Sequence, residues 1–385
     1  AKAAEALNVK ASVLHVQGRL EDALATYAQV LELEPAHREA RIARVGLLLD
    51  LGRDRETTQD LVYLAERYPN DPRAAYLRAM KLTRAGDAAG ARSHLAEAAV
   101  ELDSYRATLM NGNQQLLMLA GVVNYSLGQF QAAAEYLERY VQRFPSGVGA
   151  RKLLGAILVA RKEIDKALNV LIPAQASAPQ DPQLLSLLAG AWMAKGRHDK
   201  AATLLEEAAK LPGADAQVRT QLAHSRLTRG DVEGALQVLD EVLERDPRSE
   251  NAAMLLATVQ LRRRNYDEAM AVARGLLAQD PDNLTLLNLV ATAQAGKGER
   301  DLARRGYAAV LEKDPQFAPA RINLAKLDLQ ERTCGGARER LQAVLKDNPT
   351  DQQAFIELAR VEQRAGDLRA AIEWLEKARV ADTQA

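Results

Sequence analysis

The sequence predicts an all-α protein, an α-solenoid of about eleven helix–turn–helix units of 34 residues each. Three observations predict it: glycines recur every 34 residues, an alanine follows almost every such glycine after five residues, and proline closes most units. Between these breaks the apolar residues follow helical spacing, as in Leu184, Leu185, Leu187, Leu188 and Trp192. No stretch alternates apolar and polar residues in the way that would predict a strand.

Each unit contains one position where the chain reverses, which we call the turn position. The turn positions are Gly18, Gly52, Gly86, Gly128, Lys162, Gly196, Gly230, Arg264, Gly298, Arg332 and Gly366. Glycine adopts a left-handed conformation at little cost, so it ends one helix and lets the chain turn back. Small residues seven before and five after it mark the crossing of two antiparallel helices, and only Val45 and Thr57 depart from this rule. Proline separates the units because it cannot extend a helix, and Asp246, Asp280 and Asp314 place a capping-type side chain at the break.

The units form one predicted domain over residues 1–385, because each repeat contacts only its neighbours. They begin near Ala4, Arg38, Pro72, Gln114, Val148, Pro182, Ala216, Glu250, Leu284, Ala318 and Gln352. The period fails once, between Gly86 and Gly128, where Arg106 to Asn113 form an insertion. This insertion is either a lengthened helix or loop absorbed on one face, or a recognition loop or bend that divides three repeats from eight. No polar cap follows Trp374 and Leu375, so we expect the chain to be a fragment of a longer repeat protein.

Composition argues against several functions. Basic and acidic residues number 51 each, so no strong field recruits nucleic acid or an anionic membrane. No apolar run is long enough to span a bilayer. The five histidines are scattered, and no glycine cluster resembles a phosphate loop, so we predict no catalytic residue, no metal site and no cofactor. Cys334 is the only cysteine, which excludes an intrachain disulfide.

The repeat pattern resembles that of the tetratricopeptide repeat superfamily. The residues that carry the resemblance are Gly18-Ala23-Tyr27-Pro35, Gly128-Ala133-Leu137-Pro145 and Gly298-Ala303-Tyr307-Pro315. The resemblance implies that the helix pairs stack into a right-handed superhelix, with a concave groove lined by the first helix of each pair. It also implies an interaction scaffold rather than an enzyme, and a protein or peptide as the ligand of the groove.

In the family, the groove is lined by residues two, five, nine and twelve of each first helix. The candidate groove contacts in this chain are Ile42, Leu49, Tyr76, Met80, Met118, Val122, Tyr125, Gln183, Gln217, His224, Asn251 and Asn288. The apolar end, with its Tyr and Met side chains, suits a helix or extended peptide. The amide and hydroxyl residues further along, which include Ser186, Thr220 and Thr258, suit peptide backbone or sugar hydroxyls. Near its end the predicted lining gains charged and aliphatic residues, among them Ile322. Some candidates, such as Tyr76 and Met118, have an alternative role in packing between repeats.

A narrower resemblance concerns segments such as Leu61 to Pro72 and Leu137 to Pro145, which are similar to the long bacterial repeat lipoproteins of exopolysaccharide and PEP-CTERM sorting systems. It implies a periplasmic or outer-membrane-associated location in a Gram-negative bacterium, with the cytoplasm left open. Three functions follow. The first is a non-catalytic scaffold for envelope exopolysaccharide assembly or export, or for the linked sorting system. The second is a polysaccharide-binding module, and the third is the regulatory repeat region of a larger enzyme such as a glycosyltransferase.

Overall fold

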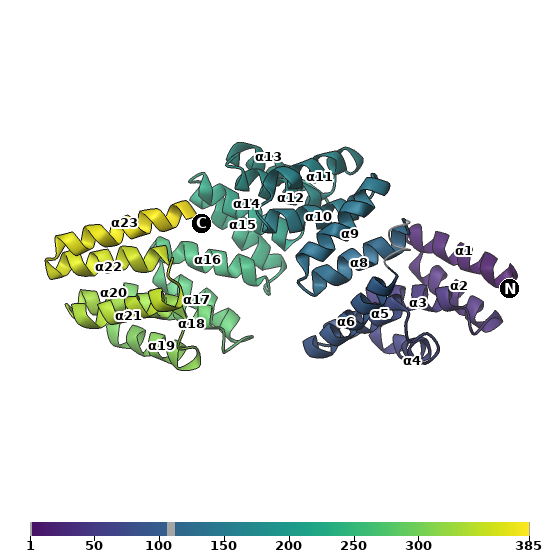
Figure 1. Cartoon of the computed structure of the whole chain (residues 1–385), viewed down its shortest axis with the longest axis horizontal. Helices are drawn as coiled ribbons and strands as arrows, with labels where there is room; N and C mark the ends of the chain where they lie inside the picture. Colours follow the sequence, from purple (N-terminus) through teal and green to yellow (C-terminus); the bar gives the residue numbers. More distant parts are fainter. Residues whose placement is uncertain (1, 106–111, 385) are drawn as a thin grey trace. The chain divides into compact units, whose positions relative to one another are not determined.

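The computed structural model describes residues 2–105 and 112–384, and all regular structure within them is helical. The fold is therefore the predicted all-α solenoid of helical repeats (Figure 1). The chain divides into two compact units, Ala1–Leu204 and Leu205–Ala385, which are described separately. The division falls inside one helix, α13 (His198–Lys210).

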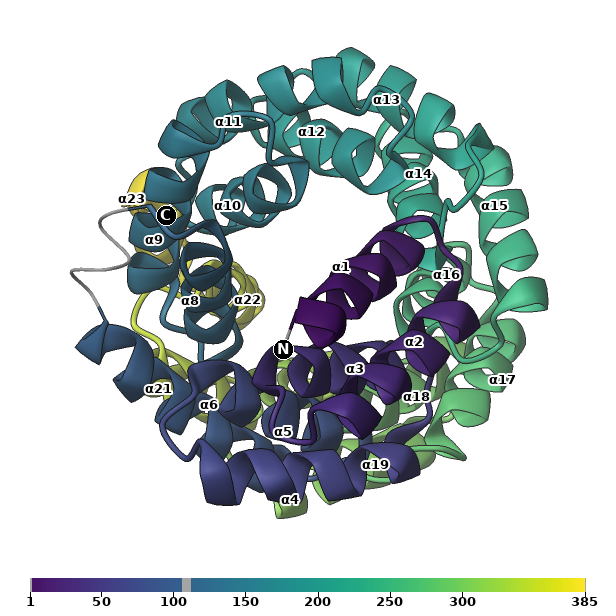
Figure 2. The ribbon, with the colours of Figure 1, turned by 90° about the vertical axis from the view of Figure 1, so that its right-hand side faces the viewer.

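The first unit is a run of antiparallel helix pairs. Its helices before α13 are α1 (Lys2–Val16), α2 (Leu20–Leu33), α3 (Arg38–Asp50), the 3-10 helix η1 (Asp54–Thr57), α4 (Thr58–Arg67), α5 (Pro72–Arg84), α6 (Ala88–Ser104), α8 (Gln114–Ser126), α9 (Phe130–Arg143), α10 (Val148–Ala160), α11 (Ile164–Ser177) and α12 (Pro182–Ala194). Figure 2 shows the first helices of successive pairs, α8, α10 and α12, on the inner side of this unit's curve, with α9 and α11 outside them.

The second unit repeats the same arrangement. After α13 its helices are α14 (Ala216–Thr228), α15 (Val232–Arg245), α16 (Glu250–Arg262), α17 (Tyr266–Leu277), α18 (Leu284–Lys297), α19 (Arg300–Lys313), α20 (Ala318–Gln330), α21 (Cys334–Asp347), α22 (Gln352–Ala365) and α23 (Leu368–Gln384). From α3 onward, each first helix begins at the residue where the sequence pattern places the start of a unit; α1 begins at Lys2, two residues before Ala4.

The turn positions have the backbone conformation that the pattern predicts. All eleven have positive φ, including the three that are not glycine: Lys162 at 61°, Arg264 at 65° and Arg332 at 64°. A left-handed residue directly after a helix lets the chain reverse and satisfies the last carbonyls of that helix. The left-handed turn is therefore a feature of every repeat, and the three residues larger than glycine adopt it at a cost in free energy.

The hydrophobic core is a series of similar junctions, each between the second helix of one pair and the first helix of the next. At one junction Ala337, Leu341 and Val344 of α21 pack against Ala354 and Leu358 of α22, and all five are almost completely buried. Leu171 and Ala174 of α11 meet Leu184 and Leu188 of α12 in the same way. Because every junction buries the same repeat positions, the core runs along each unit without a single centre.

Buried ion pairs supplement the apolar core in a few repeats. Asp60 of α4 is completely buried and accepts hydrogen bonds from Arg41 and Arg44 of α3, the latter at 2.7 and 2.8 Å. In the second unit, Arg304 of α19 donates to buried Asp328 of α20 at 2.8 Å.

The next junction carries an equivalent pair. Arg338 of α21 binds Glu362 of α22 through two hydrogen bonds of 2.7 and 2.6 Å. A buried carboxylate needs such partners because burying an unpaired charge is very costly.

The helix caps differ in detail from the prediction. Asp71, Asp181 and Asp351 cap the starts of first helices by accepting a backbone N–H at 2.8–3.0 Å. Asp246 and Asp314, predicted as capping residues, instead lie at the ends of α15 and α19 and accept the N–H two residues later, at 3.2 and 2.9 Å. They close the turn that contains the proline, and the residues just before α16 and α20, Ser249 and Phe317, make no side-chain cap.

The predicted insertion Arg106 to Asn113 lies mostly outside the described residues. On its two described sides, α6 is longer than the other second helices of the first unit, with 17 residues, and Gly112 has a φ of +90°. Asn113 then caps α8 by accepting the N–H of Leu116 at 3.0 Å.

Candidate functional site

The first helices of the first unit line a hollow of about 570 Å³, formed by α5, α8 and α9. Its lining residues are Tyr76, Gln114, Gln115, Met118, Leu119, Val122 and Tyr140. Three of them, Tyr76, Met118 and Val122, are predicted groove contacts, so the structure brings these three together. Tyr76 and Met118 also pack against the core behind the hollow, which is the packing role considered for them in the sequence.

Two tyrosines give this hollow polar groups at defined places. Burial raises the pKa of Tyr76, and the negative charge of Asp50 raises it further, so the phenol stays protonated at neutral pH. The hydroxyl of Tyr140 accepts a hydrogen bond from Nε2 of Gln114 at 2.9 Å. Room for Tyr140 depends on Gly147, where a Cβ atom would lie 2.4 Å from Cε1 of the ring.

A second hollow of about 380 Å³ lies on α14 and α16 in the second unit. Its lining residues are Gln217, Thr220, Gln221, His224, Asn251, Met254, Leu255 and Thr258. The structure thus brings together the predicted contacts Gln217, His224 and Asn251, all of which are exposed. The threonine hydroxyls bond to their own helices, Thr220 to the carbonyl of Ala216 at 2.7 Å and Thr258 to that of Met254 at 2.8 Å. The amides and the imidazole are therefore the main donors toward a ligand.

Three sequence-predicted groove residues are wrong because they lie in the core. Leu49 is completely buried against Leu61 of α4 and Leu77 of α5, since α3 carries three consecutive buried leucines and its apolar face is correspondingly wide. Ser186 and Ile322 are also buried, with 5% and 3% of their surface exposed.

The other predicted contacts line neither hollow. Ile42 and Met80 are half-buried and pack against the core between α3, α4 and α5. Tyr125 is 40% exposed and meets Phe130 edge to face, with ring centroids 5.6 Å apart. Gln183 is half-buried on α12.

Asn288 of α18 belongs to a polar network between repeats. Its Oδ1 accepts a hydrogen bond from Nδ2 of Asn323 at 3.3 Å, and Thr292 accepts bonds from Asn323 and from the hydroxyl of Tyr307. The side chain is half-buried, so this network, rather than an open hollow, sets its position.

Sequence reasoning missed seven lining residues, which are Gln114, Gln115, Leu119, Tyr140, Gln221, Met254 and Leu255. Tyr140 comes from a second helix, at a position where other repeats carry a smaller side chain such as Val30, Ala174, Val310 or Val344. That departure from the repeat pattern is the signal in the sequence that could have identified it.

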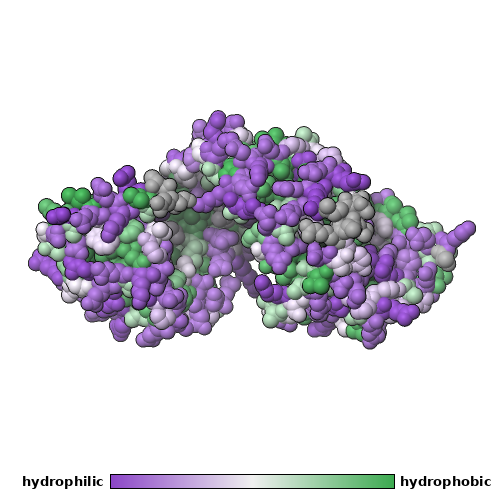
Figure 3. Space-filling view, viewed as in Figure 1, coloured by the Kyte–Doolittle hydropathy of each residue, from purple (hydrophilic) through white to green (hydrophobic). Residues whose placement is uncertain are grey.

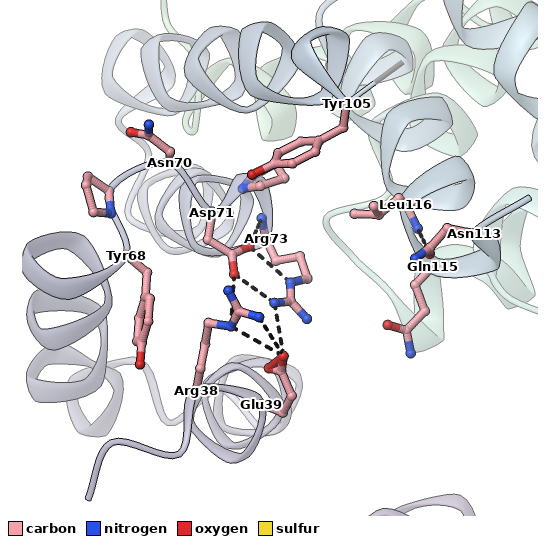
Figure 4. A pocket seen from close by; sticks show the side chains of 12 residues that line it. Arg38, Glu39, Tyr68, Asn70, Asp71, Arg73, Tyr105, Asn113, Gln115 and Leu116 are labelled. Carbon is pink, nitrogen blue, oxygen red and sulfur yellow. Dashed lines mark hydrogen bonds and ion pairs between the residues drawn. The ribbon is translucent and has the colours of Figure 1, made fainter. Parts of the chain in front are cut away.

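A further hollow of about 580 Å³ lies at the ends of the helices rather than on the groove (Figure 4). Arg73 donates to Asp71 at 2.7 Å, and Arg38 lies 3.1 Å from Glu39 and 5.3 Å from the ring centroid of Tyr68. Burial alone would raise the pKa of Asp71, but the hydrogen bonds and charge of Arg73 and the charge of Arg38 lower it overall. The two arginines and two carboxylates balance, so this hollow has no net charge to attract an ion.

The described part of the chain contains no group of three His, Cys, Asp or Glu side chains able to hold a metal ion. None of the helices in residues 2–105 and 112–384 is both long enough and apolar enough to cross a bilayer. The chemistry offered by the groove hollows is apolar contact together with hydrogen-bond donors and acceptors from amide, hydroxyl and imidazole groups.

Stacked helix pairs with hollows on their first helices define a helical-repeat interaction scaffold. The sequence matches two tetratricopeptide repeat families, one over residues 8–56, 220–283 and 322–385 and the other over residues 125–191. The chain belongs to the tetratricopeptide repeat superfamily. No curated protein matches it in sequence.

Solved structures share the fold at low sequence identity. The chain is similar to yeast Tom70, with 16% identity, a TM-score of 0.51 and coverage of 98% of this chain and 91% of Tom70. A tetratricopeptide repeat protein from Parabacteroides merdae gives 16% identity and a TM-score of 0.51, covering 69% and 98%. A human IFIT1 dimer with m7Gppp-AAAA gives 14% identity and a TM-score of 0.53, covering 89% and 90%. At these identities the likeness concerns the fold alone.

Proposed function

We propose that this chain is a non-catalytic scaffold that binds a protein segment along its first-helix groove. The observation that carries the proposal is the first-unit hollow, where Tyr76, Met118 and Val122 present half-buried apolar surface beside two amide side chains. Tyrosine is among the residues that contribute most of the binding energy in many protein interfaces, and methionine adapts its shape to irregular apolar partners. The neighbouring Gln114 and Gln115 offer hydrogen bonds to a peptide backbone.

The test is a crosslinking pull-down from cells of the native organism, comparing the wild-type chain with a Tyr76→Ser/Met118→Ser variant. Loss of specific partners from the variant is expected, because both changes remove apolar surface from the hollow. The matched control is Val62→Ser, which changes a half-exposed valine on α4 that lines no groove hollow. Equal capture by all three proteins would contradict the proposal, provided that circular dichroism shows the same helicity.

We further propose that the scaffold works in a bacterial envelope, in exopolysaccharide assembly or export or in the linked protein-sorting system. Its support is the similarity of segments such as Leu137 to Pro145 to the repeat lipoproteins of those systems. Envelope glycan-assembly proteins among the captured partners are the expected result. Cytosolic enzymes or chaperones as the specific partners would overturn this location and role, while leaving the groove proposal intact.

A second candidate function, binding of polysaccharide, is favoured by the second-unit hollow. Gln217, His224 and Asn251 are exposed and offer hydrogen-bond donors and acceptors, which suits sugar hydroxyls. Its test is retention of the chain on immobilised exopolysaccharide, which should be lost in Gln217→Ala/Asn251→Ala and kept in Tyr76→Ser/Met118→Ser. Retention that is the same in both variants would contradict this second function.

A further inference from the structure

A hollow of about 360 Å³ lies in the second unit, on the side of α14 that faces away from the groove. The helices α13, α14 and α15 form it, and its lining residues are Glu206, Ala209, Lys210, Arg219, Leu222, Arg226, Gln237, Val238 and Glu241. Its three α14 residues each follow a lining residue of the groove hollow by two positions, which is a rotation of about 200° around the helix. Figure 3 shows a largely hydrophilic surface over α13, near the top of the view. We call this hollow the outer hollow.

One lining residue, an arginine, belongs to a recurring position of the repeat. Four repeats carry arginine eleven residues before the turn position, namely Arg41, Arg151, Arg219 and Arg321. Arg41 donates to the carboxylate of Asp60, and Arg321 donates to that of Asp347 at 2.6 Å. Arg151 donates to two backbone carbonyls, at 2.8 and 3.0 Å. In these three repeats the chain itself therefore supplies an acceptor for the guanidinium.

The fourth arginine, Arg219, has no such acceptor. Its side chain is half-buried and makes no hydrogen bond or ion pair within residues 2–105 and 112–384. The reason is in the sequence, because Val238 stands where the second repeat has Asp60, and Arg245 stands where the tenth has Asp347. Neither side chain can accept a hydrogen bond. The guanidinium of Arg219 thus keeps a fork of N–H donors whose geometry matches a carboxylate.

The outer hollow also has an excess of positive charge. Its charged lining residues are three basic and two acidic ones, Lys210, Arg219, Arg226, Glu206 and Glu241. Both acidic side chains already have partners, since Oε1 of Glu206 lies 3.7 Å from Nη1 of Arg229, and Oε1 of Glu241 accepts a hydrogen bond from Gln237 at 3.1 Å. Arg226 in turn lies 4.0 Å from Asp231. With Arg229 and Asp231 included, four basic groups stand against three acidic ones, so one added carboxylate balances the charge.

We propose that the outer hollow binds the carboxylate of an aspartate or glutamate side chain of a partner protein, with Arg219 as its main hydrogen-bond donor. The ligand carboxylate takes the role that Asp60 and Asp347 have in two other repeats. Lys210 adds a second cation, and Leu222 offers apolar contact beside it. The site lies on the opposite side of α14 from the groove, so it goes beyond the proposed groove function and does not depend on it.

The test is nuclear magnetic resonance of the isotope-labelled 385-residue chain, read at the side-chain Nε–H of Arg219. Its loss in Arg219→Gln assigns this resonance. The probe is the blocked tripeptide acetyl-Ala-Glu-Ala-amide, compared with the same tripeptide carrying Gln in place of Glu and with inorganic phosphate. The Glu peptide is expected to shift the resonance saturably, and more weakly as salt is added. No shift, equal shifts with the Glu and Gln peptides, or tighter binding of phosphate than of the Glu peptide would overturn the proposal.

A second variant supplies an acceptor within the chain and leaves Arg219 in place. Arg245→Asp puts a carboxylate at the position from which Asp347 binds Arg321, so it should weaken binding of the Glu peptide by at least about tenfold. The matched control is Arg274→Asp, the same change of charge at an exposed residue of α17 outside the outer hollow. An equal effect of the control would overturn the proposal, because it indicates a general field rather than a site.

A further variant separates this site from the groove. Tyr76→Ser/Met118→Ser, which alters the first-unit hollow, should bind the Glu peptide as the wild type does. Weaker binding in this variant, at unchanged helicity, would contradict the placement of the peptide in the outer hollow. Failure of the Glu peptide to bind leaves the groove proposal intact, since that proposal is tested by capture of partners at the first-unit hollow.

Discussion

Arg264 occupies a turn position at a φ of 65°, a conformation that costs a residue with a Cβ roughly 1–2 kcal/mol. Its side chain makes no hydrogen bond or ion pair with the described residues. Arg264→Gly removes the strain but gives the unfolded chain more freedom, which costs about 0.5–1 kcal/mol. The difference predicts a gain of about 0.5–1 kcal/mol in the free energy of unfolding, with Arg264→Asn in between because asparagine tolerates the left-handed region better than arginine.

The assay is urea unfolding of wild type and variant, followed by circular dichroism, with hydrogen exchange to locate the effect. Two control substitutions set the expected size of the effects of backbone freedom and of left-handed strain. Ala85→Gly, at an exposed residue with a φ of −78°, should lose about 0.5–1 kcal/mol. Gly230→Ala, at a φ of 82° where an added Cβ meets nothing within 4 Å, should lose about 0.5–1 kcal/mol, because the strain exceeds the reduced freedom of the unfolded chain. A loss in Arg264→Gly as large as that in Ala85→Gly would refute the reasoning.

Three further outcomes are expected. Asp60→Ala leaves Arg41 and Arg44 without their shared carboxylate and should lower the free energy of unfolding in urea by about 3–5 kcal/mol. A loss as small as that caused by replacing an exposed aspartate would contradict this expectation. The pKa of Asp71 in the folded state lies below its usual 3.8, so the unfolded chain binds the proton first as the pH falls. The stabilisation from this carboxylate is therefore lost as the pH falls below about 4. The drop in melting temperature at acid pH should be smaller in Asp71→Asn than in the wild type. Ala303 has no exposed surface at its helix crossing, so Ala303→Trp should lower the free energy of unfolding by roughly 1–3 kcal/mol. Hydrogen exchange should become faster only in its own repeat and the adjacent ones. Equally faster exchange across the whole chain would argue against nearest-neighbour coupling.

The sequence was sufficient to predict the helix pairs and the backbone at their turns. The period assigned Lys162, Arg264 and Arg332 to turn positions although none is glycine, and all three have positive φ. This works because a repeat pattern averages many copies of one local geometry, so a single unfavourable residue does not obscure it.

The candidate site was harder to predict, because a groove depends on which side chains the neighbouring helices cover. Leu49 occupies a groove position in the repeat but is buried, since the wide apolar face of α3 lies against α4 and α5. Tyr140 reaches the first-unit hollow from a second helix, in space left by Gly147. Both outcomes depend on side-chain size in adjacent helices, which the period does not encode.

The buried pairs Arg304–Asp328 and Arg338–Glu362 join the second helix of one repeat to the first helix of the next. At the arginine position, other repeats carry apolar residues such as Leu168 and Leu236. A solenoid of near-identical units is prone to a particular misfolding error, in which a unit docks on the wrong neighbour and one repeat is looped out. Looping out the repeat α18–α19 would set Met270 of α17 against buried Asp328 of α20, and a buried carboxylate that loses a partner is very costly. Because the two pairs are equivalent, they set these repeats apart from the earlier ones, but not from each other.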